Sequence, residues 1–213
     1  METERNRKIG IFGGTFDPSH EGHVDMASGL IASRLLDHVL FVPSAFPPHK
    51  PSAPVSDFRH RVNMLRIAIE TRKELGISEI ELEIGRNPSY TYYTIEALEG
   101  KSPGDHLYLV MGSDSIRQLH TWHRCQEILD RWDLIVYPRD GYIPQKDELM
   151  GWWDLKRTSK ILGSIHLLKE YDVSSTAIRK MIRGKQNIGN LLNPKVYDYI
   201  LKNSLYQNGE KNV

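Results

Sequence analysis

Along the first 170 residues, short apolar segments alternate with longer amphipathic stretches, and this alternation constrains the fold more than any other feature of the sequence. Six segments rich in Ile, Leu and Val have the length of strands: 8–12, 38–43, 79–84, 106–111, 132–137 and 164–168. Between them, apolar residues recur at helical spacing, as at 24–35, 62–69 and 116–129. This alternation predicts an α/β fold, in which a parallel sheet carries helices on both faces and ligands bind beyond the carboxyl ends of its strands.

The pattern changes after residue 168. We expect a short helix near 176–182, a Gly- and Asn-rich turn at 184–190, and a helix at 194–201 with Pro194 in its first turn. We interpret the chain, 1–213, as a single domain. Its predicted parts are a parallel-sheet core over 1–170, a C-terminal helical appendage over 171–205 and a flexible tail over 206–213.

The balance of charges limits the partners of the chain. Its 28 Lys and Arg residues face 27 Asp and Glu residues, so the formal net charge is +1. This argues against a protein that mainly coats nucleic acid or an anionic membrane. The single cysteine, Cys125, excludes an internal disulfide. No signal-peptide pattern and no run of ~20 apolar residues occurs. We therefore expect a cytoplasmic protein that binds neither nucleic acid nor membrane.

Two glycines directly follow the first predicted strand. Gly13 and Gly14 lack the Cβ atom that would keep a ligand away from the backbone. They also lead toward a helix start, whose free N–H groups favour anions such as phosphate. The Walker pattern and the GxGxxG dinucleotide fingerprint are both absent. The pair therefore indicates either a phosphate-binding turn or only a tight turn.

Two histidines stand at the start of the helix that follows. His20 and His23 are three residues apart and can project toward one side. Their spacing is compatible with three interpretations. They can be a helix cap and a surface or core histidine, a metal-binding pair completed by Asp17, or two imidazoles that donate hydrogen bonds to phosphate oxygens.

Five ordered motifs carry a resemblance to a known family. Residues 13–23 (GGTFDPSHEGH) resemble the T/H-x-G-H signature of the nucleotidyltransferase superfamily. The whole chain looks more closely like the bacterial nicotinate mononucleotide adenylyltransferases, over nearly its full length. The further matching segments are 41–50 (FVPSAFPPHK), 89–94 (SYTYYT), 111–114 (MGSD) with 119–122 (LHTW), and 173–179 (VSSTAIR).

The resemblance implies a fold and an activity. The fold is a Rossmann-like doubly wound parallel sheet with a C-terminal helical appendage. The activity is transfer of the adenylyl group of ATP to nicotinate mononucleotide, which gives nicotinate adenine dinucleotide and pyrophosphate in NAD biosynthesis. The alternative acceptors are nicotinamide mononucleotide and phosphopantetheine. Mg²⁺ would arrive with ATP, held mainly by phosphates and water and by no dedicated protein site. A homodimer is possible.

The resemblance also assigns residues to the ATP half of the site. Catalysis of this transfer has to align two anions and stabilise charge on phosphates, and this demand suits Gly, His, Lys, Ser and Arg. His20, His23 and Arg179 are the expected catalytic residues. The expected ATP-binding residues are Gly13, Gly14, Thr15, Phe16, Lys50, Gly112, Ser174, Ser175 and Thr176. The alternatives are an ordinary helix N-cap beside an exposed Arg179, and a solvated Lys50 in a proline-rich loop.

For the mononucleotide half, the resemblance assigns Asp114, Thr91, Tyr92, Trp122 and His123. Trp122 would stack on the pyridine ring, and backbone N–H groups near Thr91, Tyr92 and His123 would receive the nicotinate carboxylate. The alternatives are a core position for Trp122 and a helix N-cap for Asp114, which could also contact ribose.

Two features stand outside these assignments. Residues 137–141 (YPRDG) reorder the Arg-Pro-Gly turn common among the relatives that the chain resembles. The pair Trp152 and Trp153 has no site role that the sequence supplies, so it is expected to form a packed or interface patch.

Overall fold

Five parallel strands form the centre of the molecule. In the computed structural model, which describes residues 6–47, 55–139, 141–168 and 173–207, they have the order β3-β2-β1-β4-β5. The strands are β1 (Lys8–Gly14), β2 (His38–Pro43), β3 (Leu75–Ile77), β4 (His106–Gly112) and β5 (Asp133–Tyr137). The predicted α/β parallel sheet is confirmed, and the strands expected at 8–12, 38–43, 106–111 and 132–137 fall on β1, β2, β4 and β5.

Two predicted strands are wrong. Residues 79–84 alternate charged and apolar residues as a strand would, but they form helix α3 (Ile80–Ile84). Ile80 and Ile84 are also four residues apart, so the same residues suit a helix, and Gly85 ends it at φ 65°, which glycine adopts without strain. The third strand is instead β3, which pairs with β2. Residues 164–168 make an isolated bridge between Ile165 and Val136 rather than a strand.

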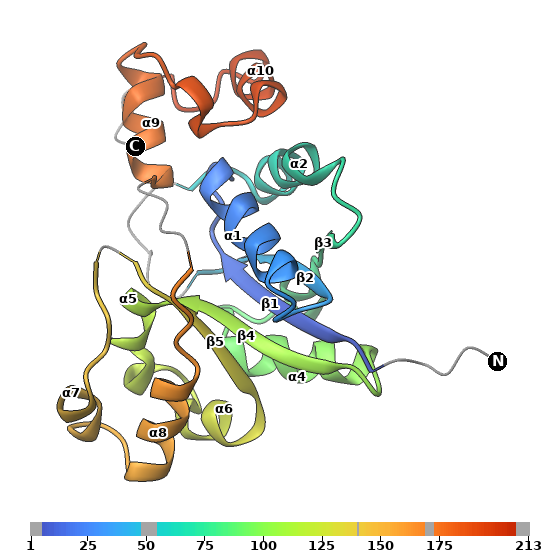
Figure 1. Cartoon of the computed structure of the whole chain (residues 1–213). Helices are drawn as coiled ribbons and strands as arrows, with labels where there is room; N and C mark the ends of the chain where they lie inside the picture. Colours follow the sequence, from blue (N-terminus) through green and yellow to red (C-terminus); the bar gives the residue numbers. More distant parts are fainter. Residues whose placement is uncertain (1–5, 48–54, 140, 169–172, 208–213) are drawn as a thin grey trace.

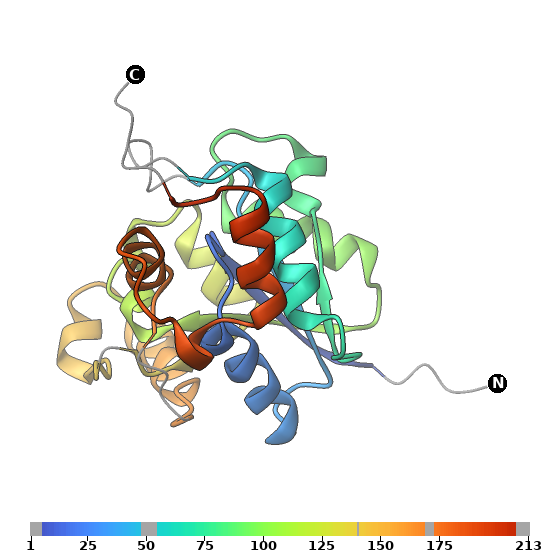
Figure 2. The ribbon, with the colours of Figure 1, turned by 90° about the horizontal axis from the view of Figure 1, so that it is seen from above.

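Helices cover both faces of the sheet, as Figures 1 and 2 show. One face is covered by α1 (Glu21–Ala32), α2 (Phe58–Ile69), α9 (Ser175–Arg183), the 3-10 turn η2 (Gly189–Leu191) and α10 (Pro194–Lys202). The opposite face is covered by α3, α4 (Thr91–Lys101), α5 (Ser113–Ile116), η1 (Leu119–Thr121), α6 (Cys125–Arg131), α7 (Lys146–Met150) and α8 (Leu155–Gly163). Each face has its own apolar core. Phe41, Leu65 and Ile200 are fully buried in the first, and Ile95 and Ile128 in the second.

The C-terminal helices dock on α2. The Tyr199 hydroxyl lies 2.9 Å from Nδ1 of His60 and accepts a hydrogen bond from the Asn63 amide at 3.1 Å. Helix α10 begins with Pro194, as predicted, and Asn193 caps it by accepting from the Lys195 N–H. The appendage is thereby attached to the rest of the molecule through polar as well as apolar contacts. Within the described residues, no helix is long and apolar enough to cross a membrane.

Candidate active site

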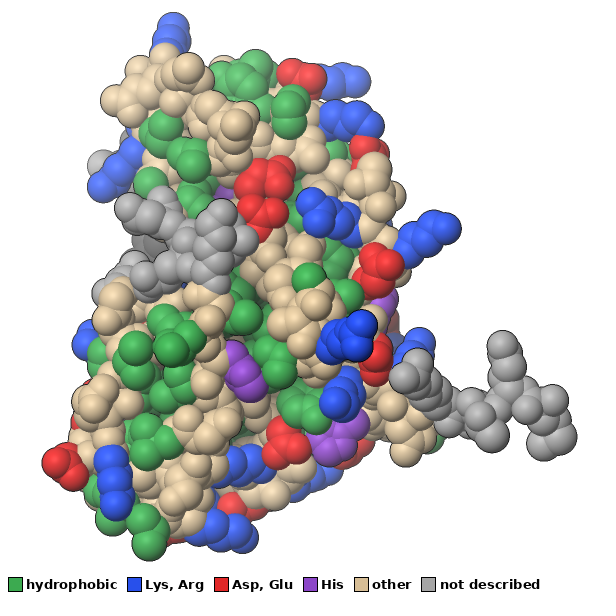
Figure 3. All heavy atoms as spheres, in the orientation of Figure 1, with side chains coloured by type: hydrophobic (Ala, Val, Ile, Leu, Met, Phe, Trp, Pro, Cys, Tyr) green, Lys and Arg blue, Asp and Glu red, His purple; other side chains and the backbone are tan. Residues whose placement is uncertain are grey.

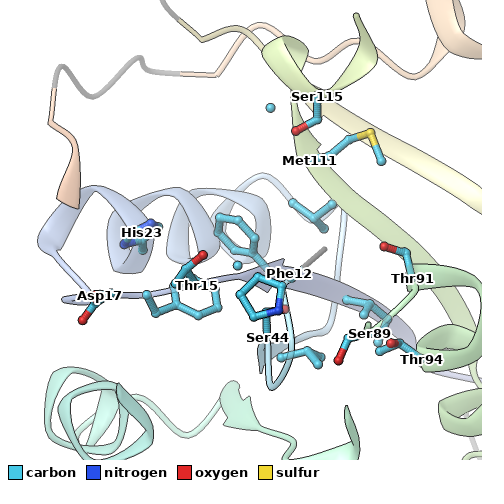
Figure 4. A pocket seen from close by; sticks show the side chains of 18 of the residues that line it. Phe12, Thr15, Asp17, His23, Ser44, Ser89, Thr91, Thr94, Met111 and Ser115 are labelled. Carbon is cyan, nitrogen blue, oxygen red and sulfur yellow. The ribbon is translucent and has the colours of Figure 1, made fainter. Parts of the chain in front are cut away.

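A cavity of about 630 Å³ opens at the carboxyl ends of β1, β4 and β5. Its walls also include the starts of α1, α4 and α9 and the segment around residue 122 (Figure 4). The structure thus brings together segments that are far apart in the sequence. The predicted site residues that line it are Gly13, Gly14, Thr15, Phe16, His20, His23, Thr91, Gly112, Trp122, His123, Ser174, Ser175, Thr176 and Arg179.

The glycine pair leaves the first wall open. A Cβ atom built on Gly13 would meet nothing within 4 Å, so the backbone here faces free space that a ligand could occupy. A Cβ on Gly14 would instead approach the Phe16 ring to 2.8 Å. Phe16 is buried and takes a left-handed backbone conformation, with φ 51°, to fold its ring back under the turn. The second glycine is therefore needed for packing and the first for access.

His20 and His23 lie face to face at the start of α1. Their ring centroids are 3.6 Å apart, and the backbone N–H of His20 donates to Nδ1 of His23 at 3.2 Å. Because Nδ1 of His23 accepts, the neutral ring carries its proton on Nε2 and can donate from there. His20 is buried, and within the described part of the chain neither of its ring nitrogens has a hydrogen-bond partner. Unpartnered buried imidazole nitrogens point to a ligand that supplies the missing partner.

The surroundings keep both imidazoles neutral. Burial, and after it the positive charge of Arg139, lower the pKa of His20 to about 4. Burial also lowers the pKa of His23 well below its usual value, with further contributions from His20 and Arg139. The unfolded chain therefore binds protons at these positions first. The stability that they contribute is complete above ~pH 6.5 and is lost as the pH falls toward the folded-state values.

Asp17 does not complete a metal site with the histidines. One of its carboxylate oxygens accepts from the Ser56 N–H at 3.2 Å, and the other accepts from the Tyr206 hydroxyl. Among the residues that the structure describes, no group of three His, Cys, Asp or Glu side chains could hold a metal ion. The geometry of the pair therefore favours the third interpretation of the sequence, two imidazoles turned toward an anion.

The start of α9 is attached to the same turn. Ser174 caps the helix by accepting from the Ala177 N–H, and the Ser175 hydroxyl donates to the carbonyl of Pro18 at 2.8 Å. The Arg179 guanidinium donates to the carbonyl of Asp17 at 2.6 Å and to the Thr176 hydroxyl at 3.2 Å. The N-cap reading of Ser174 is confirmed, but Arg179 is not a merely exposed arginine, because it holds the turn and lines the cavity.

Sequence reasoning missed Arg139, a cation at the end of β5. Its N–H donates to the Ser113 hydroxyl at 2.9 Å, and its guanidinium lies 3.5 Å from the Asp114 carboxylate. A Cβ on Gly112 would come within 3.2 Å of the Arg139 side chain and 2.4 Å of Asp114, so a larger residue would displace the Asp114 carboxylate. The rule that site residues follow the strands could have found Arg139, since it lies two residues after β5.

A second missed residue is Glu81, whose carboxylate is buried in the cavity wall. It accepts from the Ala45 N–H at 3.0 Å and from the Thr94 hydroxyl at 3.1 Å, so it ties the segment after β2 to α4. No signal in the sequence indicated it, because the strand expected at 79–84 would have placed this side chain in a sheet.

The segment that carries Trp122 is supported from two sides. His123 stacks on Tyr90 at a centroid distance of 4.5 Å, and His120 stacks on Trp152 at 3.7 Å. Trp122 itself lines the cavity and packs only partly into the second core. Trp153 is buried, whereas Trp152 is 61% exposed, so the tryptophan pair is half packed and half surface.

Two of the predicted site residues, Tyr92 and Asp114, do not line the cavity, and a third is not among the described residues. The Tyr92 side chain is buried beside Trp132, and its hydroxyl donates to Glu96, so only its backbone can serve a ligand. Asp114 stands beside the cavity and does not cap α5, whose N-cap is Gly112. Lys50 lies outside the described residues.

Comparisons with known proteins identify the family of the chain. Residues 11–181 match the cytidylyltransferase-like family. The nicotinate-nucleotide adenylyltransferase of Bacillus subtilis is 34% identical over 94% of this chain and 99% of its own length. A probable nicotinate-nucleotide adenylyltransferase of Carboxydothermus hydrogenoformans is 36% identical over 94% of this chain and 98% of its own.

Among solved structures, Plasmodium falciparum nicotinic acid mononucleotide adenylyltransferase complexed with NaAD has a TM-score of 0.75 at 20% identity. The similarity covers 94% of this chain and 97% of that chain. At this identity the likeness establishes the fold.

The placement of Arg139 can be tested through the histidines. Replacing Arg139 with Gln removes a positive charge near His20, so the pKa of His20 should rise from about 4. It should stay below ~6.5, because burial, the larger cause, remains. A titration of the imidazole resonances by NMR measures the change. The matched control is Arg157→Gln, which removes an arginine of α8 that is paired with Asp130 and Asp154. It should leave the pKa of His20 unchanged. An unaltered pKa in Arg139→Gln would contradict this electrostatic coupling.

Proposed function

We propose which residues of the cavity bind each substrate, on the premise that this chain belongs to the nicotinate-nucleotide adenylyltransferases, within the cytidylyltransferase-like family. It transfers the adenylyl group of ATP to nicotinate mononucleotide. A 5′-phosphate oxygen of the mononucleotide bonds to the α-phosphorus, and the bond from that phosphorus to the bridging oxygen breaks. Pyrophosphate leaves with the electron pair. Because the attacking oxygen is already ionised, the protein has to align and stabilise anions rather than supply a nucleophile.

The observation that carries the assignment of roles is the stacked pair of imidazoles, His20 and His23, beside the start of α9. Nε2 of His23 and the unpartnered ring nitrogens of His20 are free to meet phosphate oxygens. A polyphosphate would raise both imidazole pKa values, because negative charge favours the imidazolium form. The histidines would then carry positive charge when the substrate is present. Arg179, whose guanidinium has donors beyond its two protein contacts, would stabilise the charge that develops on the leaving group.

We assign the rest of the ATP half to backbone and small side chains. Gly13 offers open backbone, and Gly14, Thr15 and Phe16 shape the turn beside it. Across the cavity, Gly112 and the residues Ser174, Ser175 and Thr176 would border the nucleotide. Mg²⁺ would come with ATP and stay bound mainly to phosphates and water. Lys50 is proposed as a further phosphate contact.

The mononucleotide half would lie between Trp122 and the start of α4. This helix has 11 residues, and its N-cap residue Tyr90 makes no side-chain cap, so its first N–H groups suit an anion. A carboxylate needs only donors, whereas an amide also needs an acceptor for its NH₂ group, which supports the acid form of the pyridine ring as substrate. Trp122 would stack on that ring, while Thr91, Tyr92 and His123 would supply backbone donors and Asp114 would contact ribose.

Replacing His23 with Ala should lower kcat on the order of 10²-fold or more, because a donor to the reacting phosphates is lost. Pyrophosphate release from ATP and nicotinate mononucleotide measures it, with nicotinamide mononucleotide and phosphopantetheine assayed in parallel. His60→Ala removes a histidine between α2 and α10 and is the control that should keep its rate. Full activity in His23→Ala would contradict its role, and a wild-type preference for phosphopantetheine would contradict the assigned acceptor.

Replacing Trp122 with Ala should raise KM for nicotinate mononucleotide about 10-fold and leave KM for ATP nearly unchanged, since stacking of a pyridinium on indole contributes ~0.5–2 kcal/mol. Steady-state kinetics with each substrate varied measure both constants. The comparison variant is Trp132→Ala, which empties a core position. It should lower Tm with little effect on KM. If Trp122→Ala behaves like Trp132→Ala, Trp122 is a core residue.

We propose that two copies of the chain pair through the exposed apolar residues around α7 and α8. Ile143, Met150, Trp152 and Leu155 are all more than 40% exposed, and Figure 3 shows apolar side chains gathered over this part of the molecule. Such clustering is typical of an interaction surface. Trp152 also stacks on His120, so pairing here would bear on the segment that holds Trp122.

Sedimentation velocity tests this pairing. The double substitution of Trp152 and Leu155 by Glu should convert a dimer to monomer, because it places two charges in the apolar face. Leu82→Glu changes a residue of α3 that is 48% exposed and should leave the dimer intact. A wild-type protein that sediments as a monomer at micromolar concentration would refute the pairing.

A further inference from the structure

The chain turns back after α10. The helix ends at Lys202, and Ser204 and Tyr206 both take left-handed backbone conformations, with φ values of 53° and 61°. The Leu205 N–H donates to the carbonyl of Ile200 at 3.0 Å and closes the turn. A left-handed conformation is unfavourable for most residues other than glycine. Ser204 and Tyr206, on either side of Leu205, both take this conformation, and the Tyr206 side chain makes a contact outside the turn.

Tyr206 reaches the turn between β1 and α1. Its hydroxyl donates to one oxygen of the Asp17 carboxylate, which is 3% exposed, and lies near the sulfur of Met64. Burial, and then the charge of Asp17, raise the pKa of Tyr206 far above its usual value, so the hydroxyl keeps its proton and stays a donor. Tyr206, which was expected to be the first residue of a flexible tail, is instead hydrogen-bonded to Asp17, 189 positions earlier in the chain.

The turn that Tyr206 holds is the one that carries the histidines. Arg61 donates to the carbonyl of Thr15, Arg179 to that of Asp17, and Ser175 to that of Pro18. These donors secure the backbone of the turn. Tyr206, together with the Ser56 N–H, secures the Asp17 side chain, which Figure 4 shows with His23 on the same wall of the cavity.

We propose that Tyr206 is a positioning residue for adenylyl transfer: its hydroxyl holds the Asp17 carboxylate and thereby fixes the turn that presents His20 and His23 to the phosphates of ATP. The inference rests on the phosphate role proposed above for the histidines. Without the hydroxyl, one oxygen of a buried carboxylate loses its partner. It can find a new one only if the turn moves, and His20 follows Asp17 by three residues. A carboxylate released toward the cavity would also repel ATP.

The test compares two tyrosines of the C-terminal appendage. Tyr206→Phe removes the hydroxyl on Asp17, and Tyr199→Phe removes a hydroxyl that also reaches α2 but contacts His60 and Asn63, away from the cavity. Tyr206→Phe should lower kcat/KM for ATP about 10-fold, because a buried hydrogen bond to a charged group is lost. KM for nicotinate mononucleotide should stay within about 2-fold. Tyr199→Phe should change both constants by less than about 2-fold, even if its Tm falls as much as that of Tyr206→Phe.

A readout without catalysis separates this inference from the proposed function. Amide hydrogen exchange over residues 15–20 should become faster in Tyr206→Phe and keep the wild-type rate in Tyr199→Phe. Unchanged exchange together with unchanged kcat/KM for ATP would overturn the inference, as would an equal loss of kcat/KM in both variants. Absence of wild-type pyrophosphate release with nicotinate mononucleotide would overturn the proposed function, while the exchange comparison would still decide whether Tyr206 holds the turn.

Discussion

The site depends on the opening that parallel pairing creates beside β1. In the order β3-β2-β1-β4-β5, the chain leaves β1 to build one side of the sheet and then returns past it to build the other. Helices α1 and α2 therefore cover one face, and α4 to α8 the opposite face, so none of the described helices fills the space beyond the ends of β1 and β4. The cavity lies there, with Gly13 and Gly14 on one edge and Gly112 on the other. Glycine at these strand ends keeps the opening accessible.

The charged and titratable groups in this opening suit the anionic substrates proposed for it. The whole chain carries a formal net charge of +1, so long-range attraction of polyphosphates is weak. The cavity offers Arg139 and Arg179 as fixed cations among the described residues, and two imidazoles that are neutral while the cavity is empty. Imidazoles held far below their usual pKa gain charge only when negative charge is near. A site of this kind avoids four mutually repelling cations and still stabilises phosphates when they bind.

Local patterns in the sequence predicted the sheet and the histidine pair but not the long-range contacts that hold the site. The short apolar runs of β1, β2 and β4, separated by amphipathic stretches, indicated the strands of a buried sheet, and the His20–His23 spacing places both rings at one helix start. Residues 79–84 show the limit of such patterns, since the same six residues satisfy both strand and helix periodicity, and long-range contacts of Glu81 decide between them. Sequence patterns did not indicate Arg139 or Tyr206 for a related reason. Their roles come from residues that meet them only after the sheet and the appendage have formed.

The long-range contacts on the turn that carries His20 have an energetic reason. A histidine with two unpartnered buried nitrogens destabilises the empty protein, since burying a polar group without a hydrogen bond is unfavourable by about 1–3 kcal/mol. Rotation of the imidazoles toward solvent or toward the backbone of the turn would remove this unfavourable free energy. Donors from Arg61, Ser175 and Arg179 occupy the carbonyls of the turn, and Tyr206 occupies the Asp17 side chain, so these relaxed arrangements lose their partners. Contacts from α2 and from the appendage thus hold the turn while the His20 ring nitrogens lack partners, and a bound phosphate would supply those partners without rebuilding the turn.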